Sequence, residues 1–175
     1  MSNNKYERVL ALNLHPRSFG YVVAESPNRL LDWGVRRRRG NRSTDVLVQK
    51  RLRFLVELWK PSVLLIPRIG KSRKEGALLR RISRETEGYA IRVHISKKAG
   101  GPDKTLTKYK KAQLAAKQFP VLAWNLPPIR QLWEGEHYRM SFFTAAAAAS
   151  SYLHERRMRK RSRHSQSSHV SGWTR

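Results

Sequence analysis

Short hydrophobic runs, each followed by a turn sequence, fill the first 35 residues. Residues 9–14 are apolar except at Asn13, which predicts a buried central strand. A turn at 15–18 separates this run from a second one at 19–24, and the short spacing predicts an antiparallel hairpin. A third strand is expected at 29–35. The pattern therefore predicts a three-stranded antiparallel meander.

The hydrophobic spacing then changes to a helical period. Apolar residues recur with this period over 46–59, after a capping cluster at 43–45, and Pro61 ends the predicted helix. Residues 62–66 are apolar and partly β-branched, which predicts a buried strand. Because strand–helix–strand crossovers are right-handed, we expect this strand to lie parallel to the first one.

The second half of the chain continues the alternation of helices and strands. We expect a helix at 75–87, an alternating strand at 89–95, a lysine-rich helix at 103–118 and an alanine-rich last helix at 139–153. Residues 119–133 are proline-rich and irregular. This order predicts an α/β domain with a mixed five-stranded sheet.

The charge balance of the chain points to a polyanionic partner. The 175 residues include 37 Lys and Arg against 12 Asp and Glu, a net charge of +25. Nucleic acid is favoured over an acidic membrane surface. Seven cations and one acid give residues 155–175 a charge of +6, so +19 remains on the domain predicted at 1–154. The 155–175 segment is serine-rich and almost without apolar residues, which predicts a disordered basic tail.

The composition also excludes several classes of protein. The chain has no cysteine, which excludes disulfides, cysteine-ligated zinc and thiol catalysis. The apolar stretches 9–14 and 142–153 are too short for a signal peptide or a membrane span. We expect a cytoplasmic protein without a membrane partner. Binding to nucleic acid could place this protein in the nucleoid.

Clusters of basic residues are the candidate nucleic-acid contacts. One follows the third strand, one begins at the end of the fourth strand, one surrounds the Gly100-Gly101 pair, and one lies in the tail. Arg can bind a phosphate through two parallel hydrogen bonds, whereas Lys acts as a mobile point charge. The candidate residues are Arg36, Arg37, Arg38, Arg39, Arg42, Arg68, Lys71, Arg73, Lys74, Lys97, Lys98, Lys104, Lys108, Lys110, Lys111, Arg156, Arg157, Arg159, Lys160 and Arg161.

Tryptophans are a second source of nucleic-acid contacts, because they can stack on bases. Trp33 and Trp59 lie in periodic segments, which favours core packing. Trp124 and Trp133 flank a proline pair in the irregular segment, and both roles stay open for them.

The order of elements over 8–153 resembles the RuvC-type resolvase branch of the RNase H-like superfamily. The local matches are 9–21, 30–35, 63–67 and 139–146. The resemblance implies a three-layer RNase H-like fold, with the mixed sheet flanked by helices. It also implies DNA or RNA as the partner, and a homodimer, since RuvC-type resolvases pair.

Members of that branch take acidic residues from the first strand, from the end of the fourth strand and from the last helix. These carboxylates hold two divalent ions roughly 4 Å apart for phosphodiester cleavage. This sequence has Asn13, Pro67 (or its neighbour Arg68) and Thr144 at the matched positions. We therefore expect no catalytic residues, no metal or other cofactor, and a degenerate nuclease site that binds duplex or branched nucleic acid without cutting it.

Two alternatives stay open from the sequence. The first is an active divalent-metal nuclease with relocated ligands, drawn from the acids near predicted loops, which are Asp32, Glu75, Asp103, Glu134 and Glu136. The second is a structural protein associated with RNA or the ribosome.

Overall fold

The computed structural model describes residues 7–15, 18–37, 44–67, 73–96, 107–129, 131 and 135–167. Strands and helices alternate after an initial meander, as the hydrophobic pattern predicts. The elements are β1 (Val9–His15), β2 (Ser18–Ser26), β3 (Arg29–Arg37), α1 (Thr44–Trp59), β4 (Val63–Pro67), α2 (Arg73–Thr86), β5 (Arg92–Ser96), α3 (Lys108–Gln118), the 3₁₀ helix η1 (Pro120–Asn125) and α4 (Met140–Ser167).

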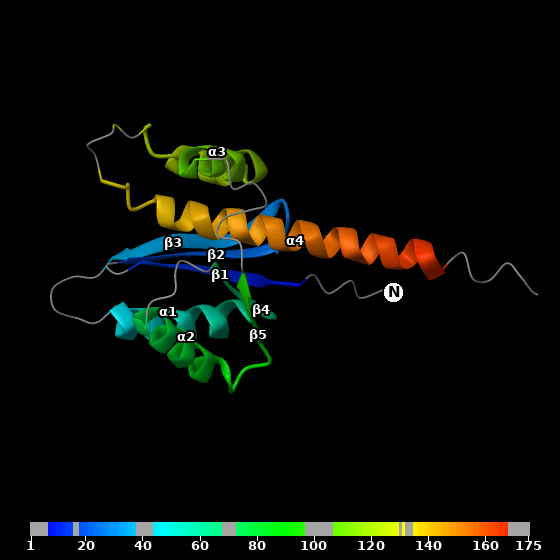
Figure 1. The fold of residues 1–175 in the computed structure, drawn as a ribbon, viewed down its shortest axis with the longest axis horizontal. Coiled ribbons are helices and arrows are strands. Elements are labelled where there is room, and N and C mark those ends of the chain that lie inside the picture. The colour runs from blue at the N-terminus through cyan, green and yellow to red at the C-terminus, as the bar shows by residue number, and fades with distance from the viewer. Residues whose placement is uncertain are drawn as a thin grey trace, which may run out of the picture.

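The strands form one open mixed sheet in the order β3-β2-β1-β4-β5. β1 pairs antiparallel with β2 and parallel with β4, and β5 continues the parallel half. Helices α1 and α2 cover one face of the sheet, while α4 lies on the other face with α3 outside it (Figure 1). The mixed five-stranded α/β sheet predicted from the sequence is thereby confirmed.

Alternation along β1 divides the hydrophobic core between the two faces of the sheet. Leu10 and Leu12 point toward α1 and pack with Leu52, whereas Val9 and Ala11 point toward α4. On the α4 side the helix contributes small buried residues. These are Ala145, Ala146, Ala148 and Ala149. Because alanine adds little bulk, the axis of α4 can come close to the sheet.

Two elements begin later than the sequence pattern predicts. β5 starts at Arg92 rather than at residue 89, because backbone bonds from Tyr89 N to Thr86 O (3.0 Å) and from Ile91 N to Tyr89 O (2.7 Å) hold a turn there. α3 starts at Lys108, after Thr107, whose hydroxyl accepts a bond from the Lys110 amide at 3.3 Å. A threonine cap of this kind fixes the first turn of a helix.

The structure also corrects the prediction for the tail. α4 continues to Ser167, so residues 155–167 are helical rather than disordered, and the prediction for 168–175 lies outside the described residues. Arg, Lys and Met are good helix formers, and extending a helix that packing has already nucleated is inexpensive. The extension protrudes beyond the sheet (Figure 1). None of the helices in the described part of the chain is both long and apolar enough to cross a membrane.

One acid anchors the start of this extension to the body. The Glu7 carboxylate accepts bonds from Arg156 Nε (3.1 Å) and Nη2 (3.2 Å) and from Arg92 Nη2 (3.4 Å). The hydrogen bond and the negative charge of Glu7 raise the pKa of Arg156. Burial raises the pKa of Tyr152, one turn earlier, and the Glu7 charge adds to that effect. α4 is therefore held by ionic contacts where its apolar contacts end.

Candidate nucleic-acid-binding edge of the sheet

The carboxyl end of β1 meets the first turn of α4. Asn13 Nδ2 donates to Ser141 Oγ at 3.4 Å, and the Ser141 hydroxyl donates to the Asn13 carbonyl oxygen at 3.3 Å. Thr144 follows one turn later, and its hydroxyl donates to the Met140 carbonyl oxygen at 3.0 Å. Asn13 therefore joins the strand to the helix.

Pro67 ends β4 at the same edge of the sheet. β4 runs parallel to β1, with Val9 opposite Val63 and Ala11 opposite Leu65. Continuing this register by two residues brings buried Pro67 level with Asn13. The three positions that the resemblance singled out thus come from neighbouring elements at one edge.

Gly20 explains how α4 comes so close. It lies opposite Asn13 in the β1–β2 ladder. A Cβ atom on Gly20 would fall 2.4 Å from the Phe142 amide nitrogen and 2.4 Å from the Ser141 carbonyl carbon. Only a glycine leaves room for the helix backbone there, so Gly20 brings Ser141 within reach of Asn13.

The described residues at this edge do not fit a carboxylate-held metal pair. Throughout the described ranges, no group of three or more His, Asp or Glu side chains could hold an ion. The acids in ion pairs with Arg or Lys are Glu7, Glu25, Asp32, Glu85 and Glu136. Asn13, Pro67 and Thr144 together offer one amide and one hydroxyl, with no negative charge.

Cationic and aromatic groups surround this edge instead. Arg36 and Arg37 end β3 and are exposed, and exposed His15 ends β1. The Arg37 guanidinium lies 5.4 Å from the ring centroid of Tyr138, and the Arg139 guanidinium lies 5.8 Å from the same ring. Tyr138 thereby connects the end of β3 to the residues that lead into α4.

Sequence reasoning missed several of these residues. Tyr138, His137 and Ser141 are neighbours in sequence just before and within the first turn of α4. The His137 ring stacks on Tyr138 with centroids 4.6 Å apart, and His137 Nδ1 accepts from the Arg139 amide at 3.3 Å. An aromatic–basic cluster before a helix was the signal available, but only tertiary packing shows that it faces β3.

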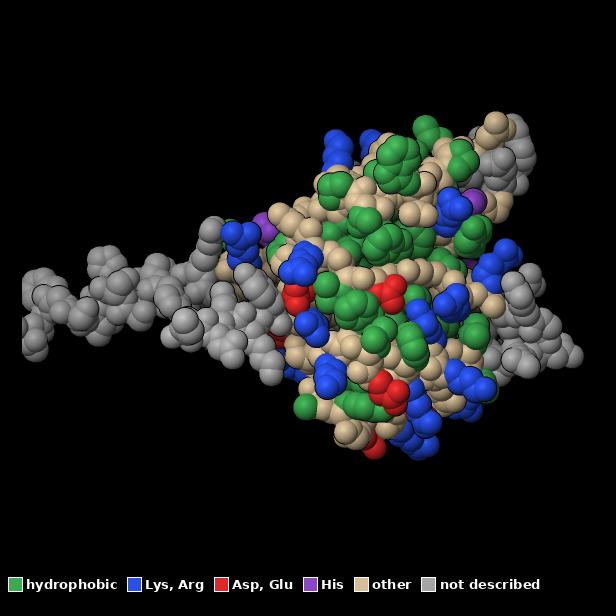
Figure 2. All heavy atoms as spheres, turned by 180° about the vertical axis from the view of Figure 1, so that it is seen from behind, with side chains coloured by type: hydrophobic (Ala, Val, Ile, Leu, Met, Phe, Trp, Pro, Cys, Tyr) green, Lys and Arg blue, Asp and Glu red, His purple; other side chains and the backbone are tan. Residues whose placement is uncertain are grey.

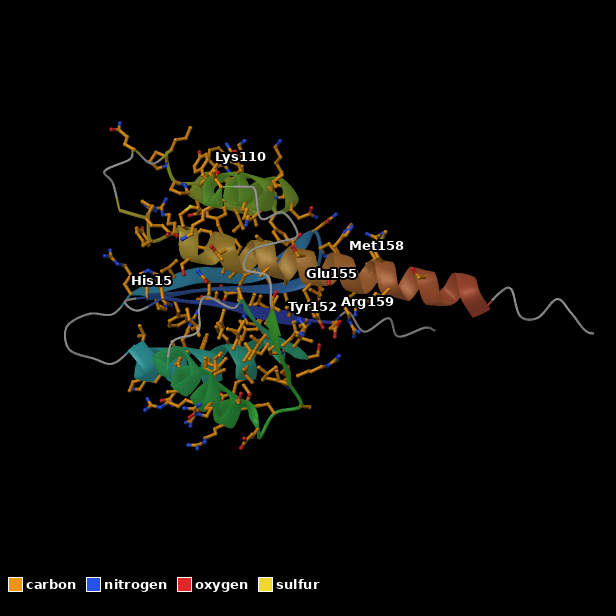
Figure 3. The ribbon with its side chains drawn as sticks, viewed as in Figure 1. His15, Lys110, Tyr152, Glu155, Met158 and Arg159 are labelled. Atoms are coloured by element: carbon orange, nitrogen blue, oxygen red, sulfur yellow. The ribbon has the colours of Figure 1, made fainter. Side chains whose placement is uncertain are left out.

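The structure does not bring the predicted basic residues together at one site. His15, at the Asn13 edge, lies at the opposite end from Arg159 on the α4 extension (Figure 3). The structure thus brings Arg36 and Arg37 to the Asn13 edge and places Arg156, Arg157 and Arg159 far from it. On α3, Lys110 is exposed, Lys111 is half-buried and Lys108 pairs with Glu136.

The remaining predicted contacts cannot be placed at the level of side chains. Arg73 and Lys74 lie in α2, and Lys160 and Arg161 lie in α4. The others lie outside the described residues, and these are Arg38, Arg39, Arg42, Arg68, Lys71, Lys97, Lys98 and Lys104.

Comparisons with known proteins bear on the fold. No protein-family model matches the chain, and no curated protein matches it in sequence. Solved structures match over most of its length. Thermus thermophilus RuvC has a TM-score of 0.61 at 14% identity, covering 86% of this chain and 96% of that one. The fowlpox virus Holliday junction resolvase scores 0.59 at 10% identity, covering 85% and 99%.

A third neighbour is the yeast mitochondrial Holliday junction resolvase Ydc2, with a TM-score of 0.55 at 15% identity, covering 85% of this chain and 78% of that one. The bacterial and the fowlpox proteins also match as complexes with Holliday junction DNA. The chain therefore has the RNase H-like fold of RuvC-type resolvases.

These neighbours overturn two expectations from the sequence. We expect from the sequence that the chain is not an enzyme and takes no cofactor, but the proteins that share its fold are RuvC and Holliday junction resolvases, so the fold points to an enzyme and neither expectation stands. Nothing in the described part of the chain positively shows an inactive site. The prediction gave more weight to the missing acids at three matched positions than to the relocated ligands that it left open, among which Asp103 and Glu134 lie outside the described residues.

Proposed function

We propose that this chain binds branched duplex DNA at the edge of the sheet where β1 and β3 end and α4 begins. One observation carries the proposal: Arg37 and Arg139, from opposite sides of this edge, both lie over the ring of Tyr138. They bring two guanidinium groups together beside the Asn13–Ser141 contact. The neighbours solved with Holliday junctions support branched DNA as the partner.

The electrostatics of this edge suit a phosphate backbone. A guanidinium group binds phosphate through two hydrogen bonds. The amides of Met140, Ser141 and Phe142 already donate to the carbonyl oxygens of His137, Tyr138 and Arg139, so only the dipole of α4 favours an anion beside its first turn. The first turn of α4 contains no acid to compete for that position. The edge thus binds by charge and shape, which positions a duplex without reading its bases.

Binding of a four-way DNA junction tests the proposal. We expect the junction to bind more tightly than a linear duplex of equal length. We expect Arg36→Gln with Arg37→Gln to weaken junction binding about 10-fold at about 0.1 M salt, because phosphate contacts provide most of the affinity. The matched control is Arg29→Gln with Lys60→Gln, at the opposite end of the same sheet, which should change the affinity less than about 2-fold.

Three outcomes would contradict the proposal. The first is equal loss of affinity in the edge variant and in the control variant. The second is a linear duplex that binds as tightly as the junction. The third is tighter binding to a folded RNA of equal charge, which would favour the RNA-associated alternative.

A second candidate function is cleavage of the bound DNA by a divalent-metal nuclease, and the fold shared with resolvases favours it. Because the three matched positions hold no acid, the ligands would come from acids elsewhere in the chain. Asp103 and Glu134 are candidates, since they precede α3 and α4 in the sequence. We expect chelation to abolish cleavage of the junction. Asp103→Asn and Glu134→Gln should each reduce cleavage by about 100-fold without loss of junction binding, as removal of a ligand would.

The control for cleavage is Glu87→Gln, an exposed acid at the end of α2. Equal loss in this control, or no cleavage of junction, duplex or hybrid with Mg²⁺ or Mn²⁺, would reject the nuclease candidate. The result of the binding experiment would stand in either case.

A further inference from the structure

An open groove lies between α3 and η1, on the outer side of α4. Its volume is about 490 Å³, and its lining residues are Lys110, Gln113, Leu114, Ala116, Lys117, Ala123 and Leu126. Four of these are aliphatic, and none is acidic. The DNA-binding edge proposed above uses none of them.

Exposed apolar side chains occur in both of the segments that form this groove. Leu114 is 51% exposed and Trp124, beside the lining residue Ala123, is 93% exposed. Val121 and Ile129, in the same segment, are also exposed. Hydrophobic side chains cluster at the α3 end of the face seen in Figure 2, with Lys and Arg beside them. A contiguous exposed apolar patch bordered by polar residues is typical of a protein-interaction surface.

The charges on the border of the groove specify the partner. Lys110 and Lys117 lie seven residues apart on α3, which is two turns or about 10.5 Å along the helix. Both are exposed. A second copy of this chain is a poor occupant, because it carries a net charge of +25 and would repeat the same lysines. Because both lysines lie on the α3 side of the groove, a partner with acidic side chains beside an apolar stripe fits both the floor and the border.

We propose that this groove binds an amphipathic helix with acidic flanks, supplied by a partner protein. α3 has 11 residues, so the groove can follow about three turns of a helix laid along it. Helices bind in such grooves through apolar residues at i, i+3, i+4 and i+7. Trp124, beside the groove, would cover one side of the bound helix, because tryptophan contributes strongly to binding at protein interfaces.

An unpaired nucleic-acid strand is the less suitable occupant. Single-strand sites stack successive bases on aromatic rings. Here the lining is aliphatic, and Trp124 is beside the groove rather than in its lining. The observations therefore favour a peptide, and an oligonucleotide serves as the competing arm of the test.

Binding of a designed peptide to the full chain tests this proposal. The probe is a fluorescently labelled peptide of about 16 residues, with Leu at the four anchor positions and Glu on both flanks. A scrambled peptide of the same composition controls for charge, because any acidic peptide is attracted to this chain. At about 0.15 M salt we expect the amphipathic peptide to bind with a Kd of tens of micromolar, about 10-fold more tightly than the scrambled one.

Surface variants localise the binding. Trp124→Ala and Leu114→Glu should each weaken the peptide about 10-fold. Met158→Ala, which is also 51% exposed but lies on the α4 extension, should leave the affinity unchanged. All three positions are exposed, so circular dichroism and thermal melting should be those of the wild type.

Equal binding of the two peptides would overturn the proposal, since charge alone would then explain the attraction. Peptide affinity that is unchanged in Leu114→Glu would overturn it too. A third result would also overturn it: the peptide does not bind, oligothymidylate does, and Trp124→Ala and Leu114→Glu weaken the binding of oligothymidylate. The groove would then be a nucleic-acid site. None of these results depends on junction binding at the Asn13 edge, which Arg36→Gln with Arg37→Gln tests separately.

Discussion

Gly20 controls the distance between the sheet and α4. Its missing Cβ leaves space for the backbone of Ser141 and Phe142, which a side chain would approach to 2.4 Å. Because these neighbours are backbone atoms of a packed helix, they cannot move aside as a flexible side chain can. The Asn13–Ser141 contact therefore depends on a residue that takes no part in it.

Gly20→Ala should lower the free energy of unfolding by about 3 kcal/mol, because it overpacks a rigid interface. The measurement is chemical denaturation, followed by junction binding under conditions where the variant remains folded. Gly88→Ala is the matched control, since a Cβ there meets no atom within 4 Å. It should change stability by less than about 0.5 kcal/mol. Equal destabilisation of both variants would contradict the close-packing account.

The site could be predicted from the sequence only in part. Asn13 and Thr144 were identifiable because they fall within hydrophobic patterns that already fix a strand and a helix. Ser141 was not, because its bond to Asn13 joins residues 128 positions apart in the chain. Tyr138 was not either, since its contact with Arg37 depends on where β3 ends relative to α4.

Among the elements, α4 changes its source of stability along its length. Its first half buries alanine and phenylalanine against the sheet, and Leu153 is the last buried residue among the described positions. Beyond it, Arg156 is half-buried through its pair with Glu7, and the residues that follow are exposed wherever their side chains are described. The extension therefore depends on an ionic anchor and on helix propensity.

Glu7→Gln should loosen the α4 extension while leaving the body folded. The pairs with Arg156 and Arg92 are partly exposed, so their loss should lower global stability by about 1 kcal/mol or less. Hydrogen exchange should be faster at amides 157–167 and unchanged at 140–150. Glu87→Gln, an exposed acid in the turn that follows α2, is the control. A fall in global stability with unchanged exchange in the extension would contradict this view.

Element prediction succeeded where burial is continuous. β1, β2 and β4 were identifiable because every second or nearly every residue is buried, which gives a strong hydrophobic pattern. The start of β5 and the end of α4 could not be predicted from the sequence, for different reasons. β5 is an edge strand with little burial, and the α4 extension is polar, so neither presents the pattern from which strands and helices are read.

At the scale of the whole molecule, the excess of positive charge is spread over the body and the extension. Residues 154–175 carry seven cations and one acid, so a chain ending at Leu153 would keep +19 of the +25. The charge of the body alone suffices to attract a polyanion.

Truncation after Leu153 should weaken junction binding at low salt without abolishing it. The slope of log affinity against log salt should become less negative by about 0.9 for each phosphate that the shortened chain no longer binds. Binding isotherms between about 0.05 and 0.2 M salt measure that slope. The same slope is measured for the edge variant, Arg36→Gln with Arg37→Gln, in the full chain and in the truncated chain, as a comparison. Complete loss of binding on truncation would contradict a role for the sheet edge.

α4 also fixes a distance. Its 28 residues extend about 42 Å from the edge that holds Ser141 to the far end of the basic extension. One turn of B-form DNA is about 34 to 36 Å long. A continuous helix is rigid, so if the proposed DNA contacts lie at both ends of α4, the phosphates there would be separated by a little more than one turn of duplex. Inserting one residue into the extension would rotate the cations that follow it by about 100° around the helix axis. Those cations would then face a different side of the DNA duplex.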